Sequence, residues 1–307
     1  MNEISIVGGI TADIEGNPYN QLIRGDSNPG KISMSYGGVG RNISENLARM
    51  GASVNFISVA GDDFAGRGAV RELQEIGVNV ENIRLLQEEN TAVYMSILNI
   101  VGEMELALCN MDVLERISTD FIDAAYDSIK NSRVVGIDTN LTEETLEYAA
   151  DKLSGIPLFL DPVSVTKAER ARKLVGRFHT VKPNRMEAEV LSGMSIMSGE
   201  DLEEAGRWFI SQGVKRVFIT LGPGGVYYRD QKESGLIRPK PVSIVSATGA
   251  GDAFSAAILY AHLKGYEIGK TAELGMAAAS IAMRSKTAVN SAMSGELLRQ
   301  ELGWEED

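Results

Sequence analysis

The stretch Thr248-Gly249-Ala250-Gly251-Asp252-Ala253-Phe254 opens a long Ala-rich segment, Ala250–Leu263, that is apolar nearly all round. Such a segment is typical of a buried helix. Small residues at the start of a helix leave its first N–H groups open to a ligand, and those groups attract anions. Asp252 could simply cap the helix, or it could accept a proton from a hydroxyl group beside a bound phosphoryl group. Capping does not explain the three small residues 249–251, so we favour the catalytic interpretation.

Six short apolar runs precede this stretch and alternate with helical patterns such as Ile43, Leu47 and Met50, which share one helix face. The runs are apolar at successive positions, as is typical of parallel strands covered on both faces. This alternation predicts a mostly parallel α/β sheet with helices on both faces, whose ligands bind beyond the carboxyl ends of the strands. The expected strands are Ile4–Gly8, Val54–Ala60, Arg133–Ile137, Leu158–Leu160, His179–Val181 and Val217–Leu221, and a further buried helix is expected over Thr271–Arg284.

Two stretches interrupt this alternation and predict antiparallel strands outside the main sheet. Asp13–Tyr36 combines Gly and Pro with an alternating run, and Thr91–Asn110 has the pattern of a hairpin with its turn at Val101-Gly102-Glu103. A small sheet over the strand ends would form a lid on a bound ligand, whereas the plainer alternative is a surface hairpin without a role. We place the expected lid at about residues 13–36 and 91–110.

Composition limits the classes of function. The 307 residues fit one large domain or two small ones, and because no repeat or interdomain linker stands out we expect a single domain over residues 1–307. The 30 Lys and Arg against 42 Asp and Glu give a net charge of −12, which argues against a nucleic-acid surface because binding there relies on clustered basic residues. A small anion held by backbone N–H groups is still compatible with this charge. Cys109 with two histidines cannot build the usual zinc site.

The N-terminus and the hydropathy pattern favour a cytoplasmic protein. Met1–Val7 carries an acidic residue, Glu3, and has neither the basic segment nor the long apolar segment of a signal peptide. No stretch approaches the roughly 18–20 consecutive apolar residues that a transmembrane helix needs. We therefore expect no membrane partner.

Three more clusters follow strands or precede helices. Gly37-Gly38-Val39-Gly40-Arg41-Asn42 leads into a helix, and its glycines would let a ligand approach the backbone; a tight turn with a solvated Arg41 is the alternative. Asn184 and Glu187 follow a strand and have the spacing of a capping box, but they could also organise water and Mg²⁺ around a nucleotide. Thr220-Leu221-Gly222-Pro223-Gly224-Gly225 would suit a nucleotide that passes close to the backbone, or it is a plain turn.

Other nucleotide-binding and hydrolytic patterns are missing. Gly265–Thr271 resembles a phosphate-binding loop but has three intervening residues instead of four and follows a helix, so we interpret it as an interhelical turn. Gly8-Gly9-Ile10-Thr11 lacks the spacing of a dinucleotide-binding fingerprint, which disfavours a dehydrogenase. No nucleophile elbow points to a serine hydrolase.

The order and spacing of these clusters resemble the ribokinase-like (PfkB) carbohydrate kinases over essentially the whole chain. Gly37–Asn42 looks like the N-terminal signature of that family, and Thr248–Phe254 looks like its C-terminal signature. Asn184 with Glu187 matches its Asn-x-x-Glu element. The resemblance implies a three-layer α/β/α domain with a small β-lid, ATP as phosphoryl donor, Mg²⁺, and transfer of the γ-phosphoryl group to a hydroxymethyl oxygen.

The resemblance also implies residue roles. Asp252 would be the base, beside an anion hole formed by the N–H groups of residues 249–251. One set would hold the sugar hydroxyls: Thr11, Asp13, Gly38 and Asn42. A second set would line the nucleotide: Asn184, Thr220, Gly222, Gly225 and Thr248, with Glu187 holding Mg²⁺ through water. The anion-hole residues are Gly249, Ala250 and Gly251.

Gly37–Asn42 with the following helix is closer to the branch of the family that acts on pseudouridine than to typical ribokinases, as are Asn110-Met111-Asp112 and Thr287-Ala288-Val289-Asn290. We therefore expect 5′-phosphorylation of a ribonucleoside, pseudouridine first, with ribose or another furanose as the alternative. A non-catalytic nucleoside sensor is an alternative of another class, disfavoured by the intact Gly-Ala-Gly-Asp element.

Two further expectations concern ions and assembly. Ser246 stands where many family members have an aspartate that helps to bind a monovalent cation, so we expect weak or no activation by K⁺. The unpaired strand edges of the lid could pair with a second copy of the chain and so form a homodimer.

Overall fold

The computed structural model describes residues 3–304 of the chain. A nine-stranded sheet forms its centre, in the order β13-β12-β11-β10-β9-β8-β1-β4-β5. From β11 to β5 every neighbouring pair is parallel, whereas β12 and β13 add an antiparallel hairpin at one edge. The strands are β1 (Ile4–Val7), β4 (Val54–Gly61), β5 (Ile83–Leu86), β8 (Val134–Asp138), β9 (Leu158–Asp161), β10 (Thr180–Val181), β11 (Arg216–Thr220), β12 (Val226–Arg229) and β13 (Ser234–Ile237).

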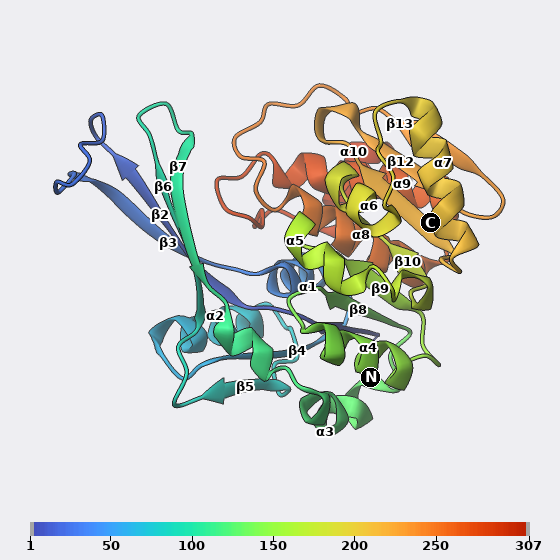
Figure 1. Ribbon diagram of the computed structural model, residues 1–307, viewed down its shortest axis with the longest axis horizontal. Coiled ribbons are helices and arrows are strands. Elements are labelled where there is room, and N and C mark those ends of the chain that lie inside the picture. Colours follow the sequence, from blue (N-terminus) through green and yellow to red (C-terminus); the bar gives the residue numbers. More distant parts are fainter. Residues whose placement is uncertain (1–2, 305–307) are drawn as a thin grey trace.

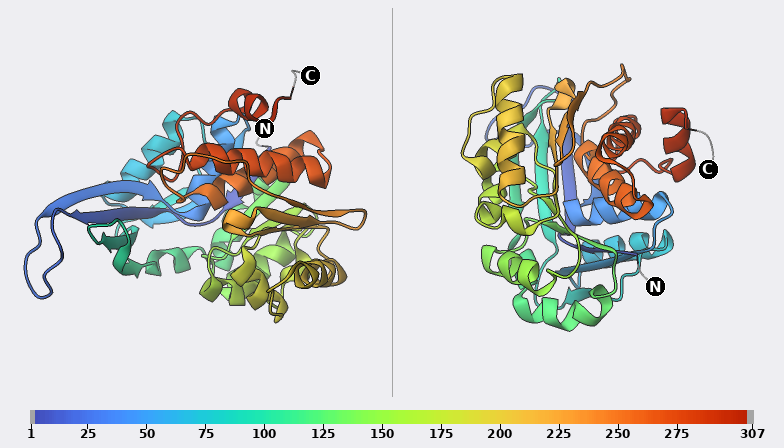
Figure 2. Two further views of the ribbon diagram at one scale, coloured as in Figure 1. Left: turned by 90° about the horizontal axis from the view of Figure 1, so that it is seen from above. Right: turned by 90° about the vertical axis from the view of Figure 1, so that its right-hand side faces the viewer.

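Helices cover both faces of this sheet, so the chain has three layers (Figure 2). One face carries α1 (Val39–Arg49), α2 (Phe64–Glu75), α8 (Ala250–Lys264), α9 (Ile268–Ala282) and α10 (Gly295–Leu302). The other face carries α3 (Thr119–Ile129), α4 (Glu143–Lys152), α5 (Val165–Ala168), α6 (Arg185–Ser192) and α7 (Gly199–Ser211). Short 3₁₀ turns span Asp112–Arg116, Glu169–Ala171, Val175–Arg177 and Gly222–Gly224. The expected α/β/α architecture is therefore confirmed.

A separate apolar core fills each interface between the sheet and its helices. The cluster under α8 and α9 contains Phe56, Phe218 and Phe254, and the cluster on the opposite face contains Phe178 and Phe209. All five rings are almost completely buried. The parallel strands lie between these two clusters, so both faces of each strand are covered by apolar side chains. This is why the strands are continuous apolar runs in the sequence.

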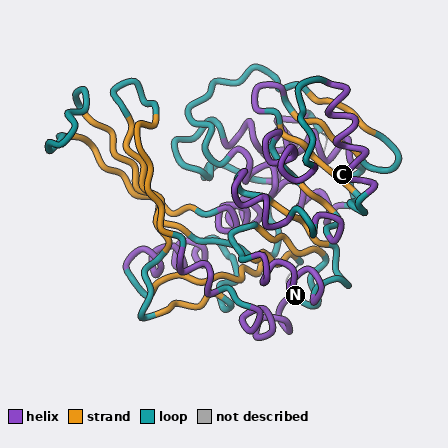
Figure 3. Tube along the Cα trace, in the orientation of Figure 1, coloured by secondary structure: helices purple, strands orange, loops and turns teal. Residues whose placement is uncertain are grey.

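A second, four-stranded sheet projects from the body as a long arm (Figures 1 and 3). Its order is β3-β2-β6-β7, with β2 (Thr11–Pro18), β3 (Gly30–Gly37), β6 (Ala92–Leu98) and β7 (Met104–Asn110). The expected small sheet is thus present, and its role as a lid stays a prediction. One detail was wrong: β2 and β6 pair in parallel, because two separate hairpins join through their inner strands.

The expected interior strands are all present, but the sequence pattern did not predict the strands near the two edges of the sheet. β5, β12 and β13 are short and carry polar residues; β5 and β13 are the two edge strands, and β12 joins β13 to β11. α9 begins at Ile268 and not at Thr271, so the loop-like Gly265–Thr271 is an interhelical turn that runs into the first turn of α9.

Within residues 3–304, none of the helices has both the length and the apolar character that crossing a membrane requires.

Candidate active site

The start of α8 presents unpaired backbone donors. Gly249 precedes the helix with φ of 80°, and a Cβ on this residue would lie 1.8 Å from the carbonyl oxygen of Ala288, so only glycine fits. Among the described residues, the backbone N–H groups of Gly251 and Asp252 have no hydrogen-bond acceptor. Free N–H groups at the positive end of a helix are suited to hold an anion.

Asp252 lies in the same turn and contacts a residue from a distant part of the chain. The Asn42 side chain, on α1, donates a hydrogen bond of 2.8 Å from Nδ2 to Oδ2 of Asp252. The surrounding protein desolvates the Asp252 carboxyl group, and this burial together with the negative Asp161 raises its pKa to about 7. The Asn42 hydrogen bond and the positive Lys182 oppose that shift. A carboxyl group with a pKa near neutrality is well matched to general-base catalysis.

Behind this turn lies a buried charged network that the sequence did not reveal. Lys182 Nζ is 3.0 Å from Asp161 Oδ2 and 3.5 Å from the carbonyl oxygen of Gly251. The hydroxyl group of Ser255 donates to the same Asp161 oxygen at 2.7 Å. Burial would lower the pKa of Lys182, but the Asp161 carboxylate raises it, so the ammonium group stays charged. The start of α8 is therefore backed by a fixed positive charge.

The carboxylate of Asp138, at the end of β8, holds the neighbouring strand and helix together. Its Oδ2 accepts hydrogen bonds of 2.9 Å from the backbone N–H groups of Gly9 and Gly40, and its Oδ1 accepts one from Asn140. A Cβ on Gly40 would lie 2.8 Å from the Cα of Gly8. The glycine at position 40 is thus required so that α1 can begin against the end of β1, which brings Asn42 to the site.

The residues expected to hold a sugar lie where the lid joins the body. Thr11 Oγ1 donates a 2.8 Å hydrogen bond to Asp13 Oδ1. A Cβ on Gly37 would collide with the Asp13 carboxylate, and Gly38 has φ of 98°. Burial raises the pKa of Asp13, partly opposed by the Thr11 hydrogen bond. Asp13 is the third residue of β2, in which Thr11 already pairs with Gly37 of β3.

The expected nucleotide residues gather at the ends of β10 and β11. Asn184 caps α6, and Glu187 completes a capping box in which both of its carboxylate oxygens accept hydrogen bonds of 2.8 Å from Asn184. Burial and the nearby Asp161 raise the pKa of Glu187. The backbone of Thr220 pairs with that of Pro183 and lies beside Asn184. The capping box that the spacing of Asn184 and Glu187 predicts is confirmed. A role for these two residues and Thr220 in binding a nucleotide stays a prediction.

The glycines after β11 differ in what they require. Gly225 has φ of 93°, and a Cβ there would lie 1.9 Å from the carbonyl oxygen of Ile237, so this glycine is needed for the β12–β13 hairpin to pack. Gly222 has φ of 58° and open space around its Cα. Thr248 donates its backbone N–H to the Ser246 side chain. Gly222 is therefore constrained by its backbone conformation and not by its neighbours.

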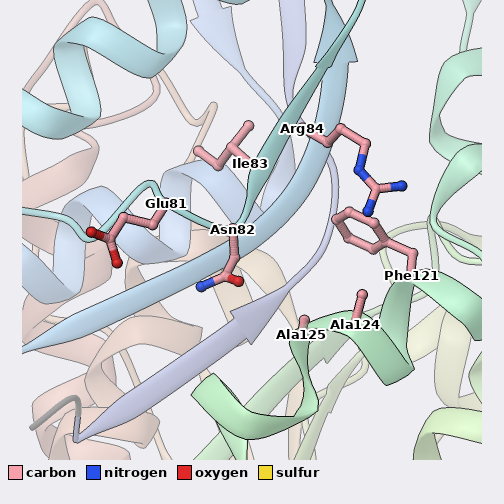
Figure 4. Close-up of a pocket in the computed structure, with 7 residues that line it drawn as sticks. All are labelled: Glu81, Asn82, Ile83, Arg84, Phe121, Ala124 and Ala125. Atoms are coloured by element: carbon pink, nitrogen blue, oxygen red, sulfur yellow. The ribbon is translucent and has the colours of Figure 1, made fainter.

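A surface cavity of about 220 Å³ lies apart from the start of α8, between β5 and α3 (Figure 4). The guanidinium group of Arg84 lies 4.9 Å from the centre of the Phe121 ring at its wall. None of the expected site residues lines this cavity, whose lining is Glu81, Asn82, Ile83, Arg84, Phe121, Ala124 and Ala125.

An open α/β sheet in which one helical turn carries free N–H groups beside a carboxyl group of raised pKa is suited to phosphoryl transfer to a hydroxyl group. The chain belongs to the pfkB family of carbohydrate kinases, whose model matches residues 1–294. It is 34% identical over 281 residues to the pseudouridine kinase of Escherichia coli, covering 91% of this chain and 90% of that protein.

Solved structures share the fold over the whole chain. A putative sugar kinase from Clostridium perfringens superposes with a TM-score of 0.88 and 32% identity, covering 99% of this chain and 96% of the other. The Arabidopsis thaliana ribokinase, solved with ribose and ATP, superposes with a TM-score of 0.85 at 21% identity over 99% and 100% of the two chains. ATP is thus bound in that ribokinase, and a putative ribokinase II from Escherichia coli of the same fold was solved with ATP and Mg²⁺.

The pKa of Asp252 predicts the acid limb of the pH profile. A base must be ionised to accept a proton, and burial raises the pKa of this group to about 7. We expect kcat/KM, which reports the free enzyme, to fall about tenfold per pH unit below that value. Initial rates across the neutral range at saturating Mg²⁺ measure this, and a profile that stays flat well below neutrality would contradict the assignment of the base.

Proposed function

We propose that this kinase transfers the γ-phosphoryl group of ATP to the 5′-hydroxymethyl group of a ribonucleoside, with pseudouridine as its first substrate. The observation that carries the chemistry is the contact between Asn42 and Asp252, 2.8 Å long, beside the free N–H groups of α8. The chain is 34% identical to a pseudouridine kinase over 91% of its length, which supports the choice of acceptor. Ribose or another furanose is the alternative acceptor.

The proposed site has two ends: a catalytic end at the start of α8, and an acceptor end where the four-stranded sheet joins the body. Asp252 takes the proton of the acceptor hydroxyl group, and that oxygen attacks the γ-phosphorus while the bond to the bridging oxygen of ADP breaks. The N–H groups of Gly251 and Asp252 stabilise the negative charge on the transferring group. On the acceptor side, the sugar hydroxyls would be held by Thr11, Asp13, Gly38 and Asn42. The lid would exclude water so that ATP is not hydrolysed.

The nucleotide would extend from the start of α8 toward Thr220 and Gly222. Mg²⁺, when bound, neutralises phosphate charge, and it is commonly held by one or two carboxylates plus phosphates and water. Glu187 would hold Mg²⁺ only through water, because both of its carboxylate oxygens accept hydrogen bonds from Asn184, and a cation there would oppose the burial and the negative Asp161 that raise its pKa. Weak or absent activation by K⁺, inferred from Ser246, stays a prediction, as does a cytoplasmic location.

A panel of acceptors tests the proposed substrate. ADP release would be measured with pseudouridine, uridine, inosine, adenosine, ribose and fructose, and the position of the phosphate determined on the product. We expect the highest kcat/KM with pseudouridine and phosphate on its 5′ oxygen. A higher kcat/KM with ribose or fructose would replace the nucleoside by a sugar, and nucleoside binding without phosphoryl transfer to any acceptor would favour a sensor.

We also propose that the lid pairs with a second copy of the chain. Successive residues of a strand point to opposite faces, and Asp13 belongs to the face opposite Ile14. The Ile14 face is apolar across all four strands and remains exposed at its outer positions. Apolar patches of this kind mark interaction surfaces. This face comprises Ile14, Ile32, Met34, Met95, Ile97, Leu106 and Leu108.

Sedimentation of the whole protein tests this assembly. We expect a dimer that Leu106→Asp converts to a monomer, because a charge in an apolar interface is left desolvated. Leu236→Asp on β13 provides the matched control, since that leucine is also about half exposed but lies outside the lid. A wild-type monomer at micromolar concentration, or equal effects of both substitutions, would contradict the lid interface.

A further inference from the structure

The side chain of Arg41 is buried beside the proposed base and its partner. Only 4% of Arg41 is exposed, so the alternative of a solvated arginine was wrong. Its guanidinium group donates from one terminal nitrogen, Nη1, to Oδ1 of Asn42 at 3.2 Å. We propose that Arg41 is a positioning residue for phosphoryl transfer, which holds the Asn42 amide with its nitrogen toward Asp252.

The chemistry of the groups permits one orientation of the amide. A guanidinium group has only donors, so it can face only the oxygen of the Asn42 side chain. The opposite end of that amide is then its nitrogen, which donates to Asp252 Oδ2 at 2.8 Å. If the amide turned over, its oxygen would face the carboxylate and its nitrogen would face the guanidinium, and both contacts would become repulsive. Arg41 therefore sets which end of Asn42 the base meets.

Two glutamates hold the guanidinium group in place. Glu45, one turn further along α1 and itself buried, lies 2.6 Å from Nη1 of Arg41, and the more exposed Glu72 of α2 lies 3.1 Å from Nη2. The other oxygen of Glu45 accepts a hydrogen bond of 2.8 Å from Arg49 Nε. A buried ion pair of this kind is weak evidence for stability, because desolvation offsets much of its attraction. Orientation of Asn42 gives this costly arrangement a function.

The charge of Arg41 also reaches the acceptor side. It lowers the pKa of Asp13, although burial dominates there and raises it. The charged groups that face Asp252 are Asp161, Asp138 and Lys182, and none of them contacts Arg41. A substitution of Arg41 therefore changes Asp252 through Asn42 and not through these neighbours.

The pH profile of an Arg41→Met variant tests the proposal. Without the guanidinium group the Asn42 amide is free to rotate, and the hydrogen bond that lowers the pKa of Asp252 is lost for part of the time. We expect kcat to fall about tenfold or more, as for the loss of a hydrogen bond to a charged group, and the acid limb of kcat/KM to move to higher pH by about half a unit or more. The best acceptor from the panel is used, so the test does not depend on pseudouridine.

Arg49→Met is the matched control. It removes a guanidinium group from the same Glu45, but Arg49 makes no contact with Asn42 and instead donates to the carbonyl oxygen of Ser291. We expect the acid limb of this control to coincide with that of the wild type. An unshifted limb in Arg41→Met, or equal shifts in both variants, would overturn the proposal and leave Arg41 as a support of α1 only.

Two further variants guard against a failure to fold. The double variant Arg41→Met/Glu45→Gln removes both charges of the buried pair, so no unpaired charge is left in the interior. Arg41→Lys keeps the charge but cannot bind Asn42 and the glutamates together as a planar fork does. Both should retain a cooperative thermal transition and show the shifted acid limb. If the double variant folds and its limb matches the wild type, Arg41 does not act through Asn42.

Discussion

The hydrogen bond between Asn42 and Asp252 joins two residues that are 210 positions apart in the sequence. It requires α1 and α8 to begin at the same edge of the sheet and to pack against each other over the core that contains Phe254. Asp138 fixes the start of α1 by accepting hydrogen bonds from Gly9 and Gly40. The positive φ of Gly249 fixes the start of α8. The site therefore exists only once the N-terminal and C-terminal halves of the chain have come together.

The sheet edge where α8 begins is suited to an anion, although the chain as a whole is negatively charged. The chain carries a net charge of −12, yet the start of α8 offers free N–H groups with Lys182 behind them. Local donors and one buried ammonium group decide what binds there, because exposed charges further away are screened by salt. The same low-dielectric surroundings raise the pKa of Asp252. The proposed anion binding and the proposed base chemistry would thus share a single physical origin, the partial exclusion of water.

The sequence predicted the interior of the fold better than its edges or its charged interior. Continuous apolar runs identified β1, β4 and β8 to β11, because strands covered on both faces must be apolar throughout. β12 and β13 escaped, since a hairpin at a sheet edge needs no such run. The parallel pairing of β2 with β6 could not be read from either hairpin alone.

Within the site, glycine spacing located Gly249 and Gly38, whose positive φ angles demand glycine. Spacing could not reveal Lys182, Asp161 or Arg41, because a charged residue that is buried by tertiary pairing reads in sequence like one on the surface. The signal available for Lys182 and Asp161 was their place at the ends of predicted strands, where ligands of parallel sheets gather.

The central claim is that Asp252 removes the proton from the acceptor hydroxyl group. The most direct measurement is a single turnover of phosphoryl transfer from ATP by Asp252→Asn, alongside its thermal unfolding at a pH above neutrality. We expect the transfer rate to fall about 10²–10⁴-fold, while the variant unfolds at a temperature at least as high as the wild type, because asparagine removes the cost of a desolvated charge whose pKa is raised. Near-normal transfer by a folded Asp252→Asn would contradict the account.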